Sequence, residues 1–387
     1  MEVSNNKMRF SPTLCVTHTC NLDCVYCYQN HDVHKHMTFE TAKKCIDWIF
    51  THIPDYATGG VEVGFIGGEP LIEFELLKQI YSYTSATYPD IEHIFYATTN
   101  GTLLNSEMKE WFSAHNKDFI LGLSLDGAKE THDANRSNSF DRIDFDFFLK
   151  NWAYQGIKMT LSEYSLPRLA ENIKFAHSLG FKRINGVNLA EGDFDWSKDE
   201  YISILIPQLS ELVDFYVEND NLILNQMFDK KLFYCERRDE KPRKWCGIGT
   251  GCVFFDTDGE RYPCSFITPM TYDEKDLHDI LNTDFSNESN FVDDGGAENC
   301  YIYPMCPICY GANYLNCKTF KIRDKSRCRL QKLIALFTAD LHAKRILKNP
   351  SRYDENTLYD TIEAIKKIRS LYLPEFESFG LSGDCNL

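Results

Sequence analysis

Three cysteines near the start of the chain, Cys20, Cys24 and Cys27, could together hold a metal centre, because they fall within eight residues of one another. Thiolates select soft metals such as zinc or the iron of iron–sulfur clusters. A structural zinc site needs four ligands, and one of three histidines would have to complete it: His18, His31 or His34. A three-cysteine loop instead suits a [4Fe–4S] cluster that leaves one iron open for a substrate or cofactor. The residues alone leave both interpretations open, and the second predicts an active site.

Glycine and polar motifs follow the next predicted strands. Gly67-Gly68-Glu69-Pro70 follows the second strand, Asn100 follows the third, and Ser124 and Asp126 end the fourth. Glycine lets a backbone approach a ligand closely, and Glu69 adds a carboxylate. Because open parallel sheets bind ligands at the carboxyl ends of their strands, we expect a ligand site here rather than turns alone. Arg136, which comes after the fourth strand, is either a ligand contact or part of a surface ion pair.

The elements that must position these motifs alternate between short apolar runs and amphipathic segments. The apolar runs predict strands at residues 9–18, 61–66, 91–98, 119–125, 158–161 and 183–189. The segments between them predict helices at residues 38–53 (with Thr38 as the N-cap), 74–88, 106–116, 140–155 and 167–179. Such alternation predicts an α/β fold with a parallel sheet. Six strand–helix units are too few for a closed eight-stranded barrel, so we expect a partial (β/α)6 TIM-like barrel.

The second half of the chain differs from the first in composition and in periodicity. A helix is predicted over residues 198–225, whereas from residue 241 to about residue 326 glycine, proline and cysteine increase and helical periodicity is absent. A β-hairpin is predicted in this region, turning at Asp258-Gly259. Residues 329–373 form a predicted helical tail that is broken at Pro350.

Composition and charge narrow the function classes. The chain has 387 residues, of which 43% are hydrophobic and 25% charged, an ordinary globular balance. Its formal net charge of −16 argues against a sequence-independent nucleic-acid binder, which needs a basic face. No apolar stretch is long enough to span a bilayer, and the first ten residues lack the apolar core of a signal peptide. We therefore expect a cytoplasmic protein without membrane or nucleic-acid partners, in which clustered cysteines hold metal rather than form disulfides.

A second set of cysteines lies towards the C-terminus. Eight of the chain's fifteen cysteines fall between residues 246 and 328: Cys246, Cys252, Cys264, Cys300, Cys306, Cys309, Cys317 and Cys328. Eight thiolates equal two fully ligated iron–sulfur clusters, although zinc ribbons use similar spacings. Cys15 and Cys45 fall in a predicted strand and helix and are expected to be small buried side chains. Cys235 and Cys385 receive no role.

The first cysteine motif, CxxxCxxC with the aromatic Tyr26 before its last cysteine, closely resembles that of the radical S-adenosylmethionine (SAM) superfamily. The resemblance implies a [4Fe–4S] cluster at Cys20, Cys24 and Cys27 with SAM bound to its open iron. It also implies that Gly67 to Pro70 bind the amino group of the methionine moiety. Further cofactor contacts, to the ribose and carboxylate, are implied at Asn100, Ser124, Asp126 and Arg136.

The second cysteine set resembles the SPASM extension of peptide-modifying radical enzymes, which carries two auxiliary [4Fe–4S] clusters. The resemblance implies one cluster at Cys246, Cys252, Cys264 and Cys317, and another at Cys300, Cys306, Cys309 and Cys328. The spacing departs from the commonest family form, CxxCxxxxxCxxxC, which leaves the pairing in doubt. The expected domains are a radical SAM partial barrel (residues 1–225), a cysteine-rich SPASM domain (226–329) and a C-terminal helical tail (330–387).

The resemblance further implies that a 5′-deoxyadenosyl radical abstracts a hydrogen atom from a peptide substrate, and two branches of the family compete. In the branch that makes formylglycine in sulfatases, an aspartate base directly follows the Pro-Cys at the hairpin end. Here Ser265 holds that position, and a serine cannot act as a carboxylate base at neutral pH. We therefore favour the branch that installs thioether, carbon–carbon or related crosslinks in ribosomally made precursor peptides. Glu191 and Asp193 are candidates for a base, although solvated loop charge is the favoured explanation for them.

The expected partners are a precursor peptide and a reductant such as flavodoxin or ferredoxin. Because the first cysteine motif starts about 20 residues into the chain, we expect no leader-binding domain before it. The precursor would then be captured by the core, by the tail or by a separate leader-peptide-binding protein. A different class, a non-catalytic metal-binding or electron-transfer protein, would need the cysteines but not the motifs at successive strand ends.

Overall fold

The computed structural model describes residues 8–29, 33–190, 195–240, 244–291 and 296–381. The chain divides into two compact units, each built from segments that are distant in sequence. The first unit comprises Met1–Leu125, His132–Ile157 and Cys246–Asn287. The second comprises Asp126–Thr131, Lys158–Trp245 and Glu288–Leu387. The predicted domain boundaries after residues 225 and 329 stay a prediction.

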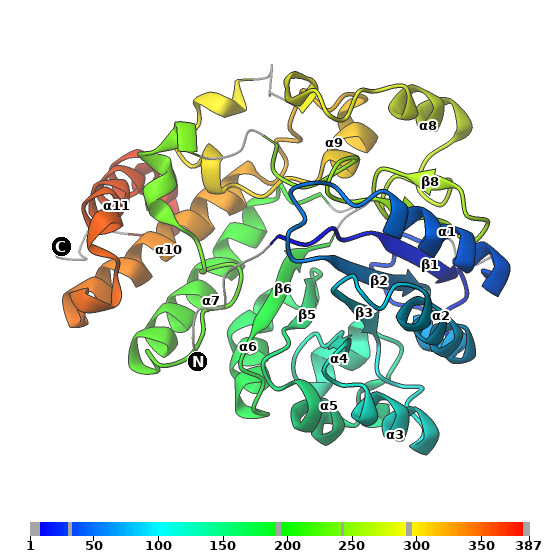
Figure 1. Cartoon of the computed structure of the whole chain (residues 1–387). Helices are drawn as coiled ribbons and strands as arrows, with labels where there is room; N and C mark the ends of the chain where they lie inside the picture. Colours follow the sequence, from blue (N-terminus) through cyan, green and yellow to red (C-terminus); the bar gives the residue numbers. More distant parts are fainter. Residues whose placement is uncertain (1–7, 30–32, 191–194, 241–243, 292–295, 382–387) are drawn as a thin grey trace. The chain divides into compact units, whose positions relative to one another are not determined.

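A six-stranded sheet forms the centre of the first unit, in the order β4-β3-β2-β1-β7-β8 (Figure 1). Its strands are β1 (Thr13–Thr17), β2 (Val61–Gly67), β3 (His93–Thr99), β4 (Phe119–Leu123), β7 (Phe254–Phe255) and β8 (Arg261–Tyr262). The first four strands are parallel, β7 is parallel to β1, and β8 is antiparallel to β7. The rings of Phe65, Phe95 and Phe119 stack across β2, β3 and β4 with centroids 5.7–6.0 Å apart, which fixes one apolar face of this sheet.

Amphipathic helices lie between these strands. They are α1 (Phe39–Thr51), α2 (Phe74–Thr87), α3 (Ser106–Ala114) and α5 (Phe145–Trp152). The short α4 (Lys129–Asn135) follows β4. Helix α1 buries Ala42, Cys45, Ile46, Ile49 and Phe50, the spacing of one helical face. The predicted N-cap is confirmed, because the Thr38 hydroxyl accepts a hydrogen bond from the backbone N–H of Thr41 at 3.1 Å.

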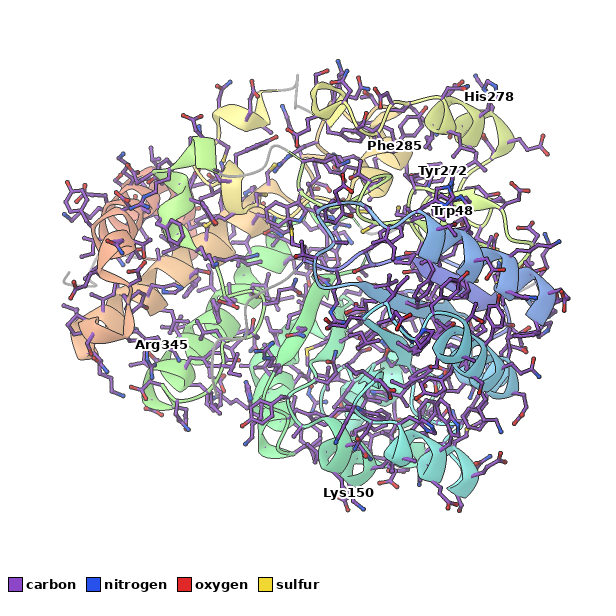
Figure 2. The ribbon with its side chains drawn as sticks, in the orientation of Figure 1. Trp48, Lys150, Tyr272, His278, Phe285 and Arg345 are labelled. Carbon is purple, nitrogen blue, oxygen red and sulfur yellow. The ribbon has the colours of Figure 1, made fainter. Side chains whose placement is uncertain are left out.

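The second unit contains a two-stranded sheet of β5 (Ile157–Leu161) and β6 (Ile184–Leu189) together with long helices (Figure 1). The helices are α6 (Leu169–Ser178), α7 (Asp199–Glu218), α9 (Tyr310–Cys317), α10 (Cys328–Lys348) and α11 (Glu355–Phe376). Helix α10 packs on both α7 and α11. The buried guanidinium of Arg345, labelled in Figure 2, donates to the carbonyl of Tyr216 at 2.9 Å and so satisfies the C-terminal end of α7.

The predicted α/β class and helical tail are confirmed, and each predicted strand is present. The strands that were expected in one partial barrel hydrogen-bond in two sheets, however, and the predicted helix at residues 140–155 begins only at Phe145, where Asp144 caps it. The prediction of no helix between residues 241 and 326 is wrong, because α8 (Glu274–Leu281) and α9 lie there. Both are short, lie in a segment rich in glycine, proline and cysteine that hides their periodicity, and start at capping side chains, Asp273 and Cys309. Among the described residues, no helix is both long and apolar enough to cross a membrane.

The predicted hairpin is confirmed as β7 and β8, and a buried ion pair attaches it to the end of β1. His18 Nε2 lies 2.5 Å from Asp256 Oδ1, and both side chains are buried. Burial alone would raise the pKa of Asp256, but hydrogen bonds from His18 and the Thr257 backbone hold that pKa below its usual value. The thiol of Cys15 lies within 4.8 Å of the same groups. The direct hydrogen bond occupies the space that a metal ion between His18 and Asp256 would need.

We predict that Asp256→Asn destabilises the first unit by about 3 kcal/mol at pH 7, because it removes the buried carboxylate that is hydrogen-bonded to His18. Since the pKa of Asp256 is lowered on folding, its contribution is present above the unfolded value of about 4 and disappears as pH falls through the folded value. Urea denaturation at pH 7 and pH 3 measures both effects. Asp258→Asn, which changes an exposed carboxylate two residues away, is the matched control and should change stability by less than about 0.5 kcal/mol. Equal stability of the two variants at pH 7 would contradict the role of the pair.

Candidate active site and metal centres

The three-cysteine loop follows β1 and is held on both sides by hydrogen bonds within the first unit. The backbone N–H of Val25 donates to the carbonyl of Asn135 at 3.0 Å. The backbone N–H of Asp23 donates to the hydroxyl of Ser137 at 2.9 Å, and that hydroxyl lies 2.9 Å from the Asp23 carbonyl. Burial raises the pKa values of the Cys20 and Cys27 thiols. Binding of a metal centre must therefore release their protons.

The predicted glycine pair lets β2 end directly against this loop. The backbone N–H of Gly68 donates to the carbonyl of Thr17 at 3.0 Å, and that of Glu69 donates to the carbonyl of Thr19 at 2.9 Å. A Cβ atom on Gly67 would lie 2.4 Å from the oxygen of Thr17. A Cβ atom on Gly68 would lie 2.4 Å from the oxygen of Thr19 and 2.7 Å from the backbone nitrogen of Cys20. The glycines are thus required for the close approach of two backbones. Their contact with a ligand stays a prediction.

The Glu69 carboxylate ties three chain segments together at the carboxyl edge of the sheet. One oxygen accepts from the Thr99 hydroxyl at 2.7 Å and from the Leu71 backbone at 3.1 Å. The other accepts from the Asn100 backbone at 2.8 Å. Burial raises the pKa of Glu69 to about 7, and these hydrogen bonds together with the charge of Arg136 oppose the rise. A carboxyl group that titrates near neutral pH in a buried site is a common property of functional positions.

Asn100 connects β3 to the cysteine loop. Its side-chain nitrogen donates to the Asn21 side-chain oxygen at 2.9 Å, and its own side-chain oxygen accepts from the Thr102 hydroxyl at 2.7 Å. The Asn21 amide in turn donates to Thr102 at 2.8 Å. The structure therefore brings this predicted cofactor residue next to the predicted metal loop.

Arg136 and Tyr26 also meet beside the cysteine loop. The guanidinium carbon of Arg136 lies 5.3 Å from the centre of the Tyr26 ring, a cation–π distance, and Arg136 is buried. The two residues that follow, Ser137 and Asn138, both have positive φ angles, 55° and 51°. Consecutive left-handed residues that are not glycine are strained, and such strain is concentrated at functional sites. The interpretation of Arg136 as a surface ion pair is wrong, because its side chain is buried against the loop.

Ser124 and Asp126 are both buried, but they belong to different units. The backbone of Ser124 donates to the carbonyl of Thr99 at 2.9 Å in the first unit. In the second unit, Asp126 accepts from the backbone N–H of Thr160 at 3.0 Å. The candidate bases Glu191 and Asp193 lie outside the described residues.

Three cysteines of the second set lie in the first unit near the hairpin. Burial, then the charges of Cys246 and Cys252, raises the pKa of Cys264 to about 11, so the three thiols are close neighbours. Ser265 follows Cys264, and the next side chain, Phe266, packs its ring 5.2 Å from that of Tyr28. Because Tyr28 follows Cys27 directly, this contact places position 265 beside the first cysteine loop. Cys317, at the end of α9, belongs to the second unit.

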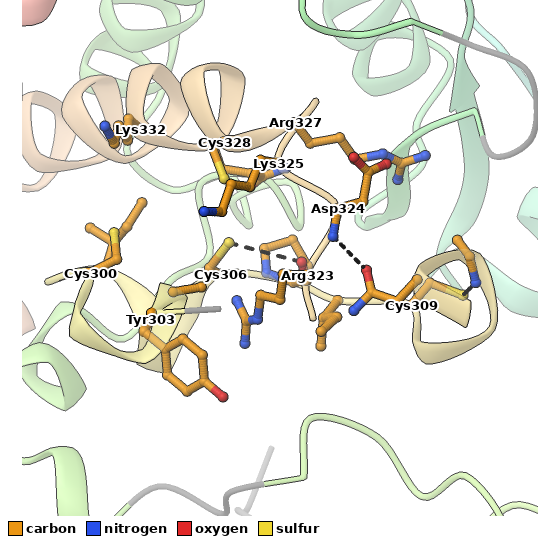
Figure 3. Close-up of a pocket in the computed structure, with 18 residues that line it drawn as sticks. Cys300, Tyr303, Cys306, Cys309, Arg323, Asp324, Lys325, Arg327, Cys328 and Lys332 are labelled. Atoms are coloured by element: carbon orange, nitrogen blue, oxygen red, sulfur yellow. Dashed lines mark hydrogen bonds between the residues drawn. The ribbon is translucent and has the colours of Figure 1, made fainter. Parts of the chain in front are cut away.

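The other four predicted cluster ligands, Cys300, Cys306, Cys309 and Cys328, line one cavity of about 300 Å³ in the second unit (Figure 3). Burial raises the pKa of Cys306 to about 11. The positive charge of Arg323 opposes this rise, and the charges of Cys328 and Cys300 add to it, so the thiols of Cys300, Cys306 and Cys328 are close together. Figure 3 shows Cys309 on the opposite side of the cavity, at the start of α9. Four thiols around one cavity fit an iron–sulfur site in their chemistry, with Cys309 set apart from the other three.

Several functional candidates were not found from the sequence. The Tyr372 hydroxyl of α11 lies 3.2 Å from the sulfur of Cys300, so the tail reaches the cavity. Asp256, Ser137 and Phe266 contact the first cysteine loop or the strand before it. None carries a spacing that could identify it, because each acts through a contact between segments that are distant in sequence.

We predict that Gly68→Ala weakens metal binding at Cys20, Cys24 and Cys27, because the added Cβ forces the backbone of Thr19 and Cys20 to shift. Anaerobic reconstitution followed by iron analysis should show a loss of about four irons relative to the parent, with a folded chain by circular dichroism. Gly380→Ala is the control: its φ of +86° strains the alanine backbone, but no atom lies within 4 Å of the added Cβ, so it tests the effect of a glycine replacement without a clash. Unchanged iron content in Gly68→Ala would show that the loop tolerates the shift.

Comparisons with known proteins find chains of similar sequence and fold. Residues 14–145 match the family described as the radical SAM superfamily. The cysteine-type anaerobic sulfatase-maturating enzyme of Clostridium novyi (strain NT) is 25% identical over 322 residues, which cover 74% of this chain and 83% of that protein. The solved structure of native anSMEcpe with bound AdoMet has a TM-score of 0.65 at 20% identity, over 89% of this chain and 100% of that one. Streptococcus suis SuiB bound to precursor peptide SuiA has a TM-score of 0.56 at 16% identity, over 83% and 76%.

Proposed function

We propose that this chain, a radical SAM enzyme homologous to peptide and protein maturases, modifies a ribosomally made precursor peptide and most simply installs a crosslink in it. The radical SAM fold implies one [4Fe–4S] cluster and SAM, and we propose two auxiliary clusters in addition. The observation that carries the proposal is the buried set of Glu69, Asn100 and Arg136 against the three-cysteine loop.

The group that the loop would hold, a [4Fe–4S] cluster with SAM, supplies a 5′-deoxyadenosyl radical that takes a hydrogen atom from the substrate. Cys20, Cys24 and Cys27 would hold the cluster, and their thiols fit it in number and type. Glu69, when ionised, would bind the amino group of the methionine moiety, and its raised pKa means that a bound cation favours the ionised form. Arg136 would attract the cofactor carboxylate, and Asn100 would orient the ribose. The remaining buried contacts hold these side chains in place and exclude water.

A serine at position 265 supports the crosslinking branch. Contact between Phe266 and Tyr28 places this position beside the first cysteine loop, where a base could reach a substrate. Serine cannot take up a proton there at neutral pH. Formylglycine formation by an aspartate base at this position is therefore excluded for this chain, and a crosslinking reaction needs another acceptor.

Sulfatase maturation is the second candidate, and the 25% identity to the Clostridium novyi enzyme favours it. It would require a base other than residue 265. For either reaction we propose the same partners, a peptide substrate and a reductant such as flavodoxin or ferredoxin. Capture of the precursor by a separate leader-peptide-binding protein is part of the crosslinking proposal.

We predict that the reconstituted parent holds about twelve irons in three clusters, and that Cys20/Cys24/Cys27→Ala lowers this by about four and abolishes 5′-deoxyadenosine formation. Iron and sulfide analysis with electron paramagnetic resonance measures the clusters. Cys306→Ala should remove about four irons from the second unit, and single Cys309→Ala and Cys317→Ala variants identify which thiol completes that cluster. Cys15→Ala, a buried thiol outside both sets, is the control. Zinc in place of iron, or iron without cofactor cleavage, would contradict the enzyme proposal.

We predict that the masses of the products distinguish the two candidate reactions. The reconstituted enzyme, SAM and dithionite are incubated with a short peptide encoded beside the enzyme's gene, and separately with a cysteine-containing sulfatase peptide. A crosslink removes two hydrogen atoms from the precursor, and a thioether crosslink also resists thiol alkylation. Formylglycine formation replaces the cysteine sulfur by oxygen and removes two hydrogen atoms. Mass spectrometry that finds formylglycine and an unmodified precursor would reverse the order of the two candidates.

A further inference from the structure

A strongly basic segment interrupts this acidic chain beside the four-cysteine cavity. The chain has 57 acidic and 41 basic residues overall, but residues 318–332 contain seven basic residues against one acidic residue, Asp324. The basic residues are Lys318, Lys321, Arg323, Lys325, Arg327, Arg329 and Lys332. Four of them, Arg323, Lys325, Arg327 and Lys332, line the cavity together with the thiols (Figure 3).

Three of these basic side chains make contacts within the second unit. The guanidinium of Arg323 stacks 3.9 Å from the centre of the Tyr303 ring, and Arg327 donates to the carbonyl of Ala190 at 3.1 Å. Lys332 pairs with Glu375 at 2.7 Å. These contacts fix three cations around the cavity.

Two lysines of the segment differ, because no internal carboxylate holds them. Lys325 is exposed and Lys321 is half-buried, and within the described residues neither forms an ion pair. Lys325, Arg323 and Lys332 line the same cavity as the Cys328 thiol. Solubility does not explain these surface cations beside the four cysteines, because the acidic surface of the chain already keeps it soluble.

We propose that Lys321 and Lys325, with the cations around the cavity, form the docking surface for a small acidic one-electron carrier protein. The proposal rests on the proposed function, in which the cavity holds an auxiliary cluster and the enzyme needs a reductant. Charge complementarity selects an anionic partner and speeds its encounter with the surface. The net charge of −16 repels a long polyanion such as nucleic acid, whereas a compact acidic protein contacts only the local patch. In each encounter the reduced carrier loses one electron and the enzyme gains it.

The test measures binding, not turnover. Oxidised flavodoxin and oxidised ferredoxin are titrated separately by isothermal calorimetry into the reconstituted full chain at 50 mM and 300 mM salt. We expect at least one carrier to bind with a dissociation constant in the micromolar range at low salt. That constant should rise about tenfold at high salt and about tenfold in Lys321→Glu/Lys325→Glu, because both changes remove attraction between exposed charges.

The matched control is Lys117→Glu/Lys150→Glu, which makes the same change in net charge at two exposed lysines outside the basic segment; Lys150 is labelled in Figure 2. It should change the dissociation constant by less than about twofold. Equal iron content in all three proteins shows that the clusters are intact. Equal weakening by both double variants, or no binding of either carrier at 50 mM salt, would overturn the proposal.

A poly-glutamate peptide of matched charge tests whether the surface instead recognises an acidic peptide. Tighter binding of this peptide than of either carrier overturns the proposal, and displacement only at excess concentration supports it. Failure of the proposed function would appear differently, as absent 5′-deoxyadenosine or unmodified peptides, and would leave these binding constants unchanged.

Discussion

A buried carboxylate holds the first unit's site together. Glu69 comes at the end of β2, and its oxygens accept hydrogen bonds from the start of the following turn and from the end of β3. Its own backbone N–H donates to Thr19, one residue before the first predicted metal ligand. Burying a carboxylate costs free energy, and here three hydrogen bonds offset that cost only in part, as its pKa of about 7 shows. The positive charge of Arg136 opposes the remaining rise.

The cysteine loop depends on this arrangement because a loop has no hydrogen-bonding pattern of its own. Backbone contacts to Gly68 fix one side of it, and contacts to Asn135 and Ser137 fix the other. The left-handed residues Ser137 and Asn138 cost free energy that is recovered through these contacts. On the strand side, the His18–Asp256 pair joins β1 to the hairpin whose last residues lead to Cys264. The first metal loop and three cysteines of the second set therefore share one compact unit.

In the second unit, basic side chains surround the cysteines of the cavity. Thiolates held in a cavity carry negative charge, and the surrounding Arg323, Lys325 and Lys332 reduce the cost of gathering them. A hydroxyl from the tail, on Tyr372, adds a hydrogen bond to Cys300. Charge and hydrogen bonding near the sulfurs set the potential of an iron–sulfur site. The helical tail thereby contacts a cysteine of the cavity and also packs on α10.

Local information in the sequence was sufficient to predict most elements and to propose which cysteines bind metal. Spacing alone identified Cys20, Cys24 and Cys27, and hydrophobic periodicity located the strands, because both depend on residues that are neighbours along the chain. The short helices α8 and α9, the separation of the strands into two sheets, and contacts such as His18–Asp256 and Tyr372–Cys300 were not predicted. The two contacts join segments that are far apart along the chain, and no periodicity within a segment specifies its distant partner. Sequence therefore determined which residues could bind metal, and only tertiary packing decided which of them share a unit and what surrounds them.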